Sequence, residues 1–159
     1  MEANEIIIRK AVESDNEKLW VLMKELAVFE KYIEVFAITP DIVRECGFQK
    51  SPPDFYAFIA QDKESIAGML VYYFLPYTAS NRPAIYMKEL YVNESYRGCK
   101  IGERLMEALR NEAVSKNCCQ MKWTVAPWNE GGKRFYERLG AKQNTEWLNY
   151  ELNLTEEIK

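Results

Sequence analysis

Residues 91–102 read YVNESYRGCKIG, and this segment joins a predicted strand to a predicted helix. The strand is expected over residues 85–92 from its β-branched and aromatic content, and the helix over residues 102–116 from its apolar spacing. Free backbone N–H groups and the positive end of the helix dipole make a helix start a site for anions. Arg97 and Lys100 add positive charge to the same short turn. The segment therefore predicts a site for a group such as a pyrophosphate, although two glycines can equally serve an ordinary strand-to-helix turn.

Outward from this segment, the sequence predicts elements in the order strand, two helices, three strands, helix, strand, helix, strand. The predicted strands cover residues 6–8, 55–61, 66–74, 85–92 and 120–126, and a final strand or hairpin is predicted over residues 145–154. The predicted helices cover residues 15–29, a stretch that begins at 39–41 and stops at Gly47, 102–116 and 130–139. Ser14 and Glu17 have the spacing of a capping box for the first helix. This order predicts an antiparallel meander followed by alternating strands and helices, in a single domain over residues 1–159.

The composition is that of a soluble globular protein, with 48% hydrophobic and 28% charged residues in a chain of 159. Its formal net charge of −3 disfavours nucleic-acid binding, which needs a basic face. The first ten residues hold no apolar run of the kind found in signal peptides. No stretch approaches the roughly 18 apolar residues of a membrane span. A cytoplasmic protein that binds neither nucleic acid nor membrane is expected.

The chain contains no histidine, which limits the chemistry open to it. Ser-His-Asp triads, Cys-His pairs and H-E-x-x-H zinc sites are excluded. The four cysteines show no C-x-x-C spacing, so neither a zinc site nor a disulfide framework is expected, and no metal is predicted. Acid–base catalysis must therefore use carboxylates, Tyr, Lys, Cys, a chain terminus or water.

The segment Y-R-G-x-x-I-G, after a strand that ends E-L-Y-V, resembles the coenzyme A pyrophosphate loop of the GNAT family of N-acetyltransferases. Arg97 and Gly102 match the ends of the family pattern, and Lys100 stands where its inner glycine is usual. The resemblance implies a mixed α/β fold: a mostly antiparallel sheet of six or seven strands, about four helices, and two central strands that splay apart to admit the cofactor. It also implies that the pantetheine arm pairs with the backbone of Leu90, Tyr91 and Val92. The loop residues expected to bind acetyl-coenzyme A are Arg97, Gly98, Cys99, Lys100, Ile101, Gly102 and Glu103.

A second motif, VAPWNEGGKRFYERLGA over residues 125–141, resembles the closing motif of the same family. The resemblance implies that Asn129 contacts the cofactor and that Tyr136 lies beside its sulfur. A phenol there can protonate the departing thiolate, so Tyr136 is the predicted general acid. From composition alone, an aromatic pair that packs a helix end is the favoured interpretation of Phe135 and Tyr136, and the motif reverses this preference.

A third segment, KELAVFE over residues 24–30, resembles the first-helix end of diamine and polyamine N-acetyltransferases, as does W-N-E at residues 128–130. The resemblance implies a homodimer that acetylates a primary amine of a diamine, a polyamine or a lysine-like amino acid. Phe29, Glu30 and Glu89 are the predicted substrate contacts. Transfer to a protein, peptide or antibiotic amine, and a non-catalytic acyl-coenzyme A-binding module, are the alternatives.

A base is required because an alkylamine with a pKa near 10.4 is neutral in only about one molecule in 2,500 at pH 7, a deficit of about 4.6 kcal/mol. Glu89 is the predicted base, acting through water. The polyamine enzymes resemble L-E-D-F-F-V here, whereas this chain reads M-K-E-L-Y-V, so their catalytic Glu aligns with Lys88. Cys99 is expected to be a bystander, because direct transfer needs no acyl-enzyme.

Overall fold

The computed structural model describes residues 5–76 and 79–154. The chain divides into two compact units, Met1–Ala126 and Pro127–Lys159, and each is described by itself. The first unit contains the sheet and three of the helices. Within the described residues, the second unit contains helix α4 (Glu130–Arg138) followed by an extended segment without strands.

The sheet has five strands among the described residues, in the order β1-β2-β3-β4-β5. The strands are β1 (Ile7–Lys10), β2 (Tyr56–Asp62), β3 (Ser65–Leu75), β4 (Ala84–Val92) and β5 (Met121–Lys122). Neighbours from β1 to β4 are antiparallel, whereas β4 and β5 are parallel. The predicted meander and the mixed, mostly antiparallel sheet are therefore confirmed.

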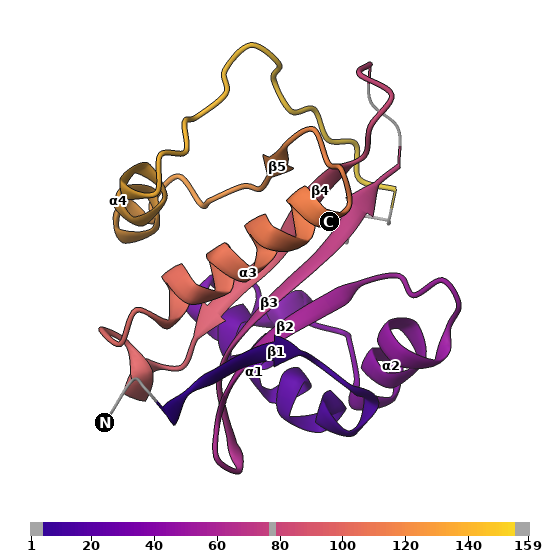
Figure 1. Ribbon diagram of the computed structural model, residues 1–159, viewed down its shortest axis with the longest axis vertical. Coiled ribbons are helices and arrows are strands. Elements are labelled where there is room, and N and C mark those ends of the chain that lie inside the picture. The colour runs from indigo at the N-terminus through magenta and orange to yellow at the C-terminus, as the bar shows by residue number, and fades with distance from the viewer. Residues whose placement is uncertain (1–4, 77–78, 155–159) are drawn as a thin grey trace. The chain divides into compact units, whose positions relative to one another are not determined.

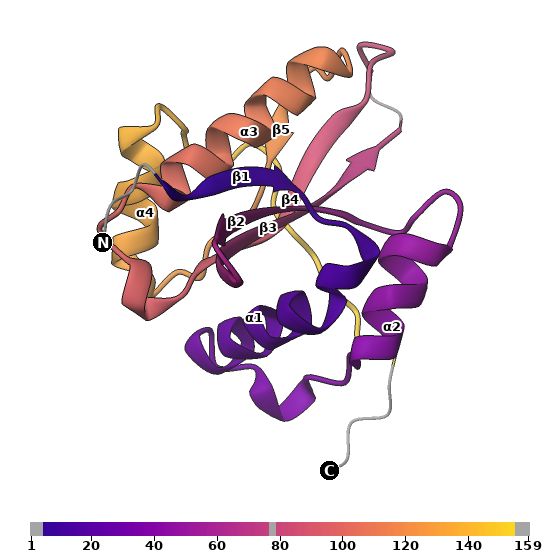
Figure 2. The same cartoon turned by 60° about the horizontal axis from the view of Figure 1, so that its bottom comes forward.

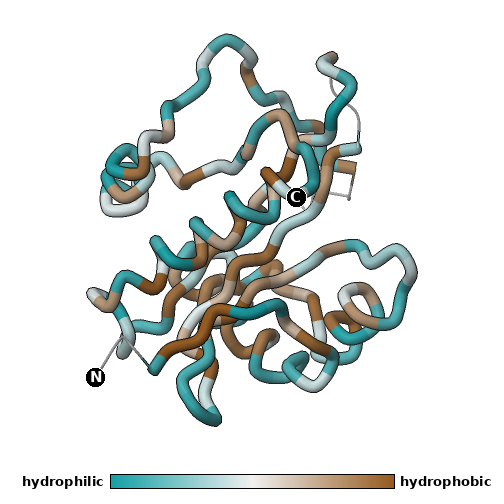
Figure 3. The backbone as a smooth tube through the Cα atoms, in the orientation of Figure 1, coloured by the Kyte–Doolittle hydropathy of each residue, from teal (hydrophilic) through white to brown (hydrophobic). Residues whose placement is uncertain are grey.

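Helices cover both faces of this sheet. Helices α1 (Asn16–Phe29) and α2 (Pro40–Arg44) lie on one face, and α3 (Ile101–Ser115) lies on the other (Figures 1 and 2). The hydrophobic stretches in Figure 3 follow the central strands, whereas the loops are mostly hydrophilic. The core under α1 consists of Leu19, Leu22, Met23, Leu26, Val43, Ala57, Ile59, Met69, Val71 and Tyr91. Since strand β3 is covered on both faces, its sequence is nearly continuously apolar.

Two predicted strands differ from the structure. Residues 120–126 pair with the sheet only at Met121 and Lys122. Residues 145–154 form no strand, and the described part of the second unit contains no other strand to pair with them. The expected six or seven strands are therefore wrong for the described residues, which contain five. An alternating pattern shows that a segment can bury one face in a sheet, but it does not supply the neighbouring strand.

Gly47 does not end the second helix as predicted. Helix α2 begins as expected, with the Thr39 hydroxyl accepting a hydrogen bond from the Ile42 amide at 3.2 Å. The chain then continues in a wider helical turn over Glu45–Gln49. A Cβ atom at position 47 would lie 2.6 Å from the ring of Phe55. A side chain at position 47 would therefore have to displace the Phe55 ring.

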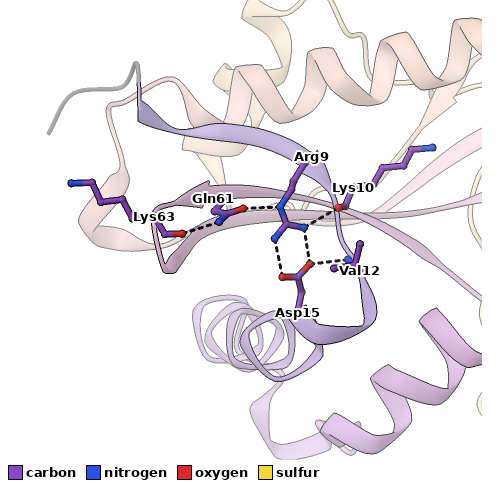
Figure 4. A network of polar contacts seen from close by, with 6 residues as sticks. All are labelled: Arg9, Lys10, Val12, Asp15, Gln61 and Lys63. Carbon is purple, nitrogen blue, oxygen red and sulfur yellow. Dashed lines mark hydrogen bonds and ion pairs between the residues drawn. The ribbon is translucent and has the colours of Figure 1, made fainter.

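The first helix is anchored by Asp15, and the predicted cap at Ser14 is wrong. Ser14 lies inside a 3₁₀ turn, Glu13–Asp15, and Asp15 is the residue that precedes α1. Figure 4 shows its carboxylate accepting two hydrogen bonds from Arg9, at 2.8 and 2.9 Å, and one from the Val12 amide at 2.7 Å. The Arg9 guanidinium also donates to Gln61 on β2, at 2.7 Å. This network joins β1, β2 and the start of α1.

We expect Asp15→Asn to lower the free energy of unfolding by about 2 kcal/mol, because it removes the charge that pairs with Arg9 and replaces one acceptor oxygen by an NH2 donor that faces the guanidinium. Burial alone would raise the pKa of Asp15, but the hydrogen bonds from Arg9 and Val12 hold it below its usual value. The stability that the pair contributes is therefore present above the unfolded carboxyl's pKa and is lost as pH falls through the lower folded pKa.

Urea unfolding between about pH 7 and pH 2 measures this effect. The matched control is Asp41→Asn, because the Asp41 side chain is 92% exposed in its ion pair with Arg44. We expect the control to change stability by less than about 0.5 kcal/mol. Equal effects of the two variants at neutral pH would contradict the anchoring role of Asp15.

Candidate active site

Glu89 is a buried carboxylate on the strand that leads into the loop. Its side chain is 14% exposed, and the Lys88 ammonium lies 3.5 Å from its Oε1 atom. The Oε2 atom has no hydrogen-bond partner among the described residues. Burial raises the pKa of Glu89, Lys88 partly offsets this rise, and the charge of Glu30 adds to it. A buried oxygen without a partner is costly, so this geometry indicates a site for a hydrogen-bond donor.

Two further groups lie close enough to Glu89 to affect it electrostatically. Glu30 is the C-cap of α1, and burial raises the pKa of its carboxyl. Burial, Glu89 and Glu30 together raise the pKa of the Tyr32 phenol. The structure thus brings together the predicted Glu30 and Glu89, and adds Tyr32. No sequence motif indicates a functional role for Tyr32. The one sequence feature that points to it is its position as an aromatic residue two places after Glu30.

This cluster has two chemical properties. A carboxyl with a raised pKa is a better proton acceptor at neutral pH than an ordinary one, since general bases work best near the operating pH. Two neighbouring carboxylates also favour a cation, and most of all a cation with two charges. The predicted contact Phe29 lies at the end of the same helix and is 42% exposed.

The loop between β4 and α3 adopts the shape that its sequence suggested. The Asn93 side chain caps a 3₁₀ turn by accepting from the Ser95 amide at 3.0 Å. Gly98 and Lys100 both have positive φ, of 87° and 60°, and α3 starts at the next residue, Ile101. The expected turn and helix start are therefore confirmed, and anion binding at this helix start stays a prediction. Cys99 is half-buried within it, and Gly102 and Glu103 form the first turn of α3.

Lys100 adopts the left-handed conformation, with φ 60° and ψ 22°. Glycine takes this conformation without steric cost, whereas other residues pay for the contact between Cβ and the backbone. The backbone here thus has the shape that the glycine of the family pattern favours, with a lysine side chain added. The sequence departs from the family pattern at position 100, but the loop adopts this conformation with a lysine in place of the glycine.

We expect Lys100→Gly to raise the free energy of unfolding by about 0.5–1 kcal/mol, and Lys100→Ala to leave it nearly unchanged. Both variants remove the ammonium, but only the glycine removes the left-handed strain. Urea unfolding of the pair measures the difference. Equal stability of the two variants would contradict a strained backbone at this residue. Coenzyme A binding to both then separates the effect of charge from that of conformation.

Arg97 connects this loop to the end of α1. Its guanidinium carbon lies 5.1 Å from the ring centroid of Phe29 and 5.9 Å from that of Tyr91, and its Nε donates to the Val92 carbonyl at 3.3 Å. A second link comes from Glu25, whose Oε1 accepts from Asn93 Nδ2 at 2.7 Å. Arg97 and Asn93 of the predicted cofactor loop therefore contact α1, the helix that ends at the predicted substrate contact Phe29.

The backbone at Leu90–Val92 is paired on one side. These residues face Leu70, Met69 and Gly68 of β3. On the other side, ladder pairing between β4 and β5 involves only Ile85 and Tyr86 of β4 among the described residues. Strand β5 ends at Lys122, so residues 87–92 of β4 have no strand partner on this edge among the described residues. This edge fits a pantetheine arm, whose amides can pair with a strand.

The other two predicted site residues lie in the second unit. Asn129 precedes α4, and its Oδ1 accepts from the Gly132 amide at 2.9 Å. Tyr136 lies on α4, with its ring centroid 5.3 Å from that of Phe135 in an edge-on arrangement. Asn129 therefore has a local structural role as a helix cap, in addition to the cofactor contact expected for it.

Comparisons with known proteins identify the family of this chain. The profile of the acetyltransferase (GNAT) family matches residues 19–141. A thialysine N-epsilon-acetyltransferase from mouse is 31% identical over 154 residues, covering 90% of this chain and 89% of the mouse protein. A human spermidine/spermine N(1)-acetyltransferase-like protein 1 is 30% identical over 141 residues, covering 84% of this chain and 20% of the human protein. Among solved structures, an integron cassette protein from the mobile metagenome of V. cholerae has a TM-score of 0.80 at 23% identity, covering 94% of this chain and 93% of its own.

The chain belongs to the GNAT acetyltransferase family. It is therefore an enzyme of the acetyl-coenzyme A-dependent N-acetyltransferase class, as predicted from residues 91–102 and 125–141. None of the described helices is long and apolar enough to cross a membrane.

Proposed function

We propose that this protein transfers an acetyl group directly from acetyl-coenzyme A to a primary amine of a small diamine, polyamine or lysine-like amino acid. The observation that carries the proposal is the Glu89 carboxylate, which is buried, has a raised pKa and presents an oxygen without a hydrogen-bond partner among the described residues. Such a group can accept a proton from an incoming ammonium, directly or through water. The printed names of the relatives, which concern thialysine and spermidine or spermine, support the acceptor class.

The cofactor site in this proposal combines the loop and the free edge of β4. Acetyl-coenzyme A supplies the acetyl group as a thioester. Backbone amides of residues 97–103 and the start of α3 hold its pyrophosphate, and the backbone of Leu90–Val92 pairs with its pantetheine arm. A backbone N–H at this edge also faces the carbonyl oxygen as negative charge develops on it. Asn129 adds a contact from the second unit.

The acid–base steps are divided between two residues in this proposal. Glu89 takes the proton that the amine must lose before it attacks the thioester carbonyl. Tyr136 donates the proton that the departing sulfur needs. The entire chain acts as one catalytic domain, and no metal takes part.

The acceptor end of the site favours a second positive charge. The charge of Glu30 contributes to the raised pKa of Glu89, so the two carboxylates interact electrostatically. An ammonium placed between them relieves this repulsion. An amine with a second ammonium, at the distance between the two carboxylates, is thus preferred over a monoamine of the same length.

Mass spectrometry of products from a pooled amine panel tests the function. The protein is incubated with acetyl-coenzyme A and polyamines, diamines, lysine, thialysine, aminoglycosides and short peptides. We expect acetylated diamines, polyamines or lysine analogues. Exclusive modification of peptides or aminoglycosides would move the assignment to those acceptors. Tight coenzyme A binding without any product would favour a non-catalytic acyl-coenzyme A-binding module.

We further propose that the protein is a cytoplasmic homodimer. The support for a dimer is an exposed apolar surface in the second unit, where Trp147, Leu148, Tyr150, Leu152 and Leu154 are 73–91% exposed. Large exposed apolar surfaces of this kind mark interaction sites. Sedimentation equilibrium of the protein and of Leu152→Asp tests it. A monomeric wild-type protein, or a variant as dimeric as the wild type, would contradict this role of the surface.

A further inference from the structure

The first unit contains a cavity that the proposed function does not use. It has a volume of about 440 Å³ and lies between the last turn of α3 and the ends of β1, β2 and β3. Its lining residues are Lys10, Tyr56, Tyr72, Phe74, Pro76, Pro83, Glu112 and Lys116. None of these residues belongs to the candidate active site. The volume is in the range of sites that hold small organic molecules.

Aromatic rings form one wall of this cavity. The Tyr56 and Tyr72 rings are stacked, with centroids 5.5 Å apart and 24° between their planes. Phe74 meets both of them edge-on, at 5.5 and 5.9 Å. Tyr72 is almost completely buried, whereas Tyr56 and Phe74 are half-buried. Their partly exposed rings therefore offer an apolar surface for a planar ligand to stack against.

Glu112, the one carboxylate among the described lining residues, already has hydrogen-bond and ion-pair partners. The Oε2 atom of Glu112 accepts from the Tyr72 hydroxyl at 2.9 Å and forms an ion pair with Lys10 at 2.5 Å. Its Oε1 atom accepts from Ser115 at 3.4 Å. A cationic ligand would have to displace Lys10 from Glu112, so the carboxylate does not favour a cation here.

Lys116 provides the unbalanced charge. It is exposed, occupies the C-cap of α3 and forms no ion pair within the described part of the chain, and its charge helps to lower the pKa of Glu112. With Lys10 and Glu112 paired, the lining of the cavity carries one net positive charge, in a protein whose formal net charge is −3. A positive charge at the rim of an aromatic cavity favours an anion with a flat apolar body.

We propose that this cavity binds a small monoanionic aromatic acid, whose ring stacks on Tyr56 and Phe74 and whose carboxylate pairs with the Lys116 ammonium. The site lies entirely within the first unit, and the proposal does not depend on the acetyl-transfer reaction. Binding requires no covalent step. Its chemistry differs from that of the candidate active site, where neighbouring carboxylates favour cations.

The probe is 4-fluorophenylacetate, observed by ¹⁹F NMR line broadening on the intact protein, with neutral 4-fluorophenylacetamide as its matched control. We expect the acid to bind with a Kd of about 1 mM. The amide should bind at least about threefold more weakly, because it cannot form the ion pair. Lys116→Gln should weaken binding of the acid by a similar factor and leave binding of the amide unchanged. Tyr56→Leu should weaken binding of both the acid and the amide.

The control variant is Lys63→Gln, which removes a lysine that is 77% exposed in the turn after β2. It should leave binding of the acid unchanged. Equal effects of Lys63→Gln and Lys116→Gln, or equal binding of acid and amide, would overturn the assignment. Displacement of the acid by coenzyme A, or no broadening at about 10 mM ligand, would also overturn it.

Discussion

Glu89→Gln should lower kcat/KM for the amine by about 10²- to 10⁴-fold, because the amide cannot accept the ammonium proton. The kcat/KM of the wild-type protein should fall as pH decreases through the pKa of Glu89. Burial raises this pKa, so the fall should begin at a higher pH than an ordinary carboxylate would give. The Glu89→Gln variant should not show this fall of kcat/KM at low pH. Initial rates over a pH series, with mass detection of product, measure both effects.

The stability of Glu89→Gln separates catalysis from misfolding. A carboxyl with a raised folded pKa stabilises the native state below its unfolded pKa, and this contribution is lost as pH rises through the folded pKa. At neutral pH the ionised Glu89 carboxylate therefore destabilises the native state. Its replacement by the neutral amide should raise the free energy of unfolding by about 1 kcal/mol. Glu107→Gln, at an exposed position on α3, is the control for both measurements. An active or a destabilised Glu89→Gln protein would each contradict the assigned role.

Tyr136→Phe should lower kcat by about 10²-fold or more while the Kd of coenzyme A stays within about twofold of the wild type. The substitution removes one hydroxyl and keeps the ring that meets Phe135 edge-on. The loss should shrink when the leaving thiol is made more acidic, since a better leaving group needs less protonation. Single-turnover acetylation with thioesters of different thiols measures this dependence.

Tyr150→Phe is the matched control, because Tyr150 lies in the same unit and is 91% exposed. It should retain wild-type kcat. Unchanged turnover in Tyr136→Phe would remove Tyr136 as the general acid and leave water, or the phenol of Tyr32, as the proton donor to examine next. Loss of coenzyme A binding in Tyr136→Phe would instead assign the residue to the cofactor site.

Much of the first unit could be predicted because its patterns are local. The apolar spacing of residues 16–29 and 101–115 follows the helical period, and each helix buries the face that the spacing marks. The aromatic and β-branched runs on either side of residues 62–65 become β2 and β3, joined by the expected tight turn. The segment 91–102 has the expected strand, turn and helix start because its glycines and charges act within one turn of chain.

The parts that sequence could not predict depend on distant partners. Asp15 replaces Ser14 as the helix anchor because Arg9, on another element, provides the guanidinium. Tyr32 joins the site through its neighbours Glu30 and Glu89, which no spacing rule relates to it. The pattern of residues 145–154 marks an amphipathic strand, but a pattern cannot say which strand will pair with it. In each case the missing information is the identity of a neighbour in space.

Under the proposed function, the edge of β4 without a strand partner makes the stability of the folded protein depend on the supply of its ligand. Residues 87–92 leave a row of backbone groups without strand partners on one edge, and such edges are prone to pair with other chains. Under the proposed function, the cofactor occupies this edge and stabilises the native state, by about 2.7 kcal/mol at a concentration 100 times its Kd. Cells depleted of acetyl-coenzyme A should therefore lose this protein to aggregation and proteolysis faster than well-fed cells, which links its lifetime to the metabolic state.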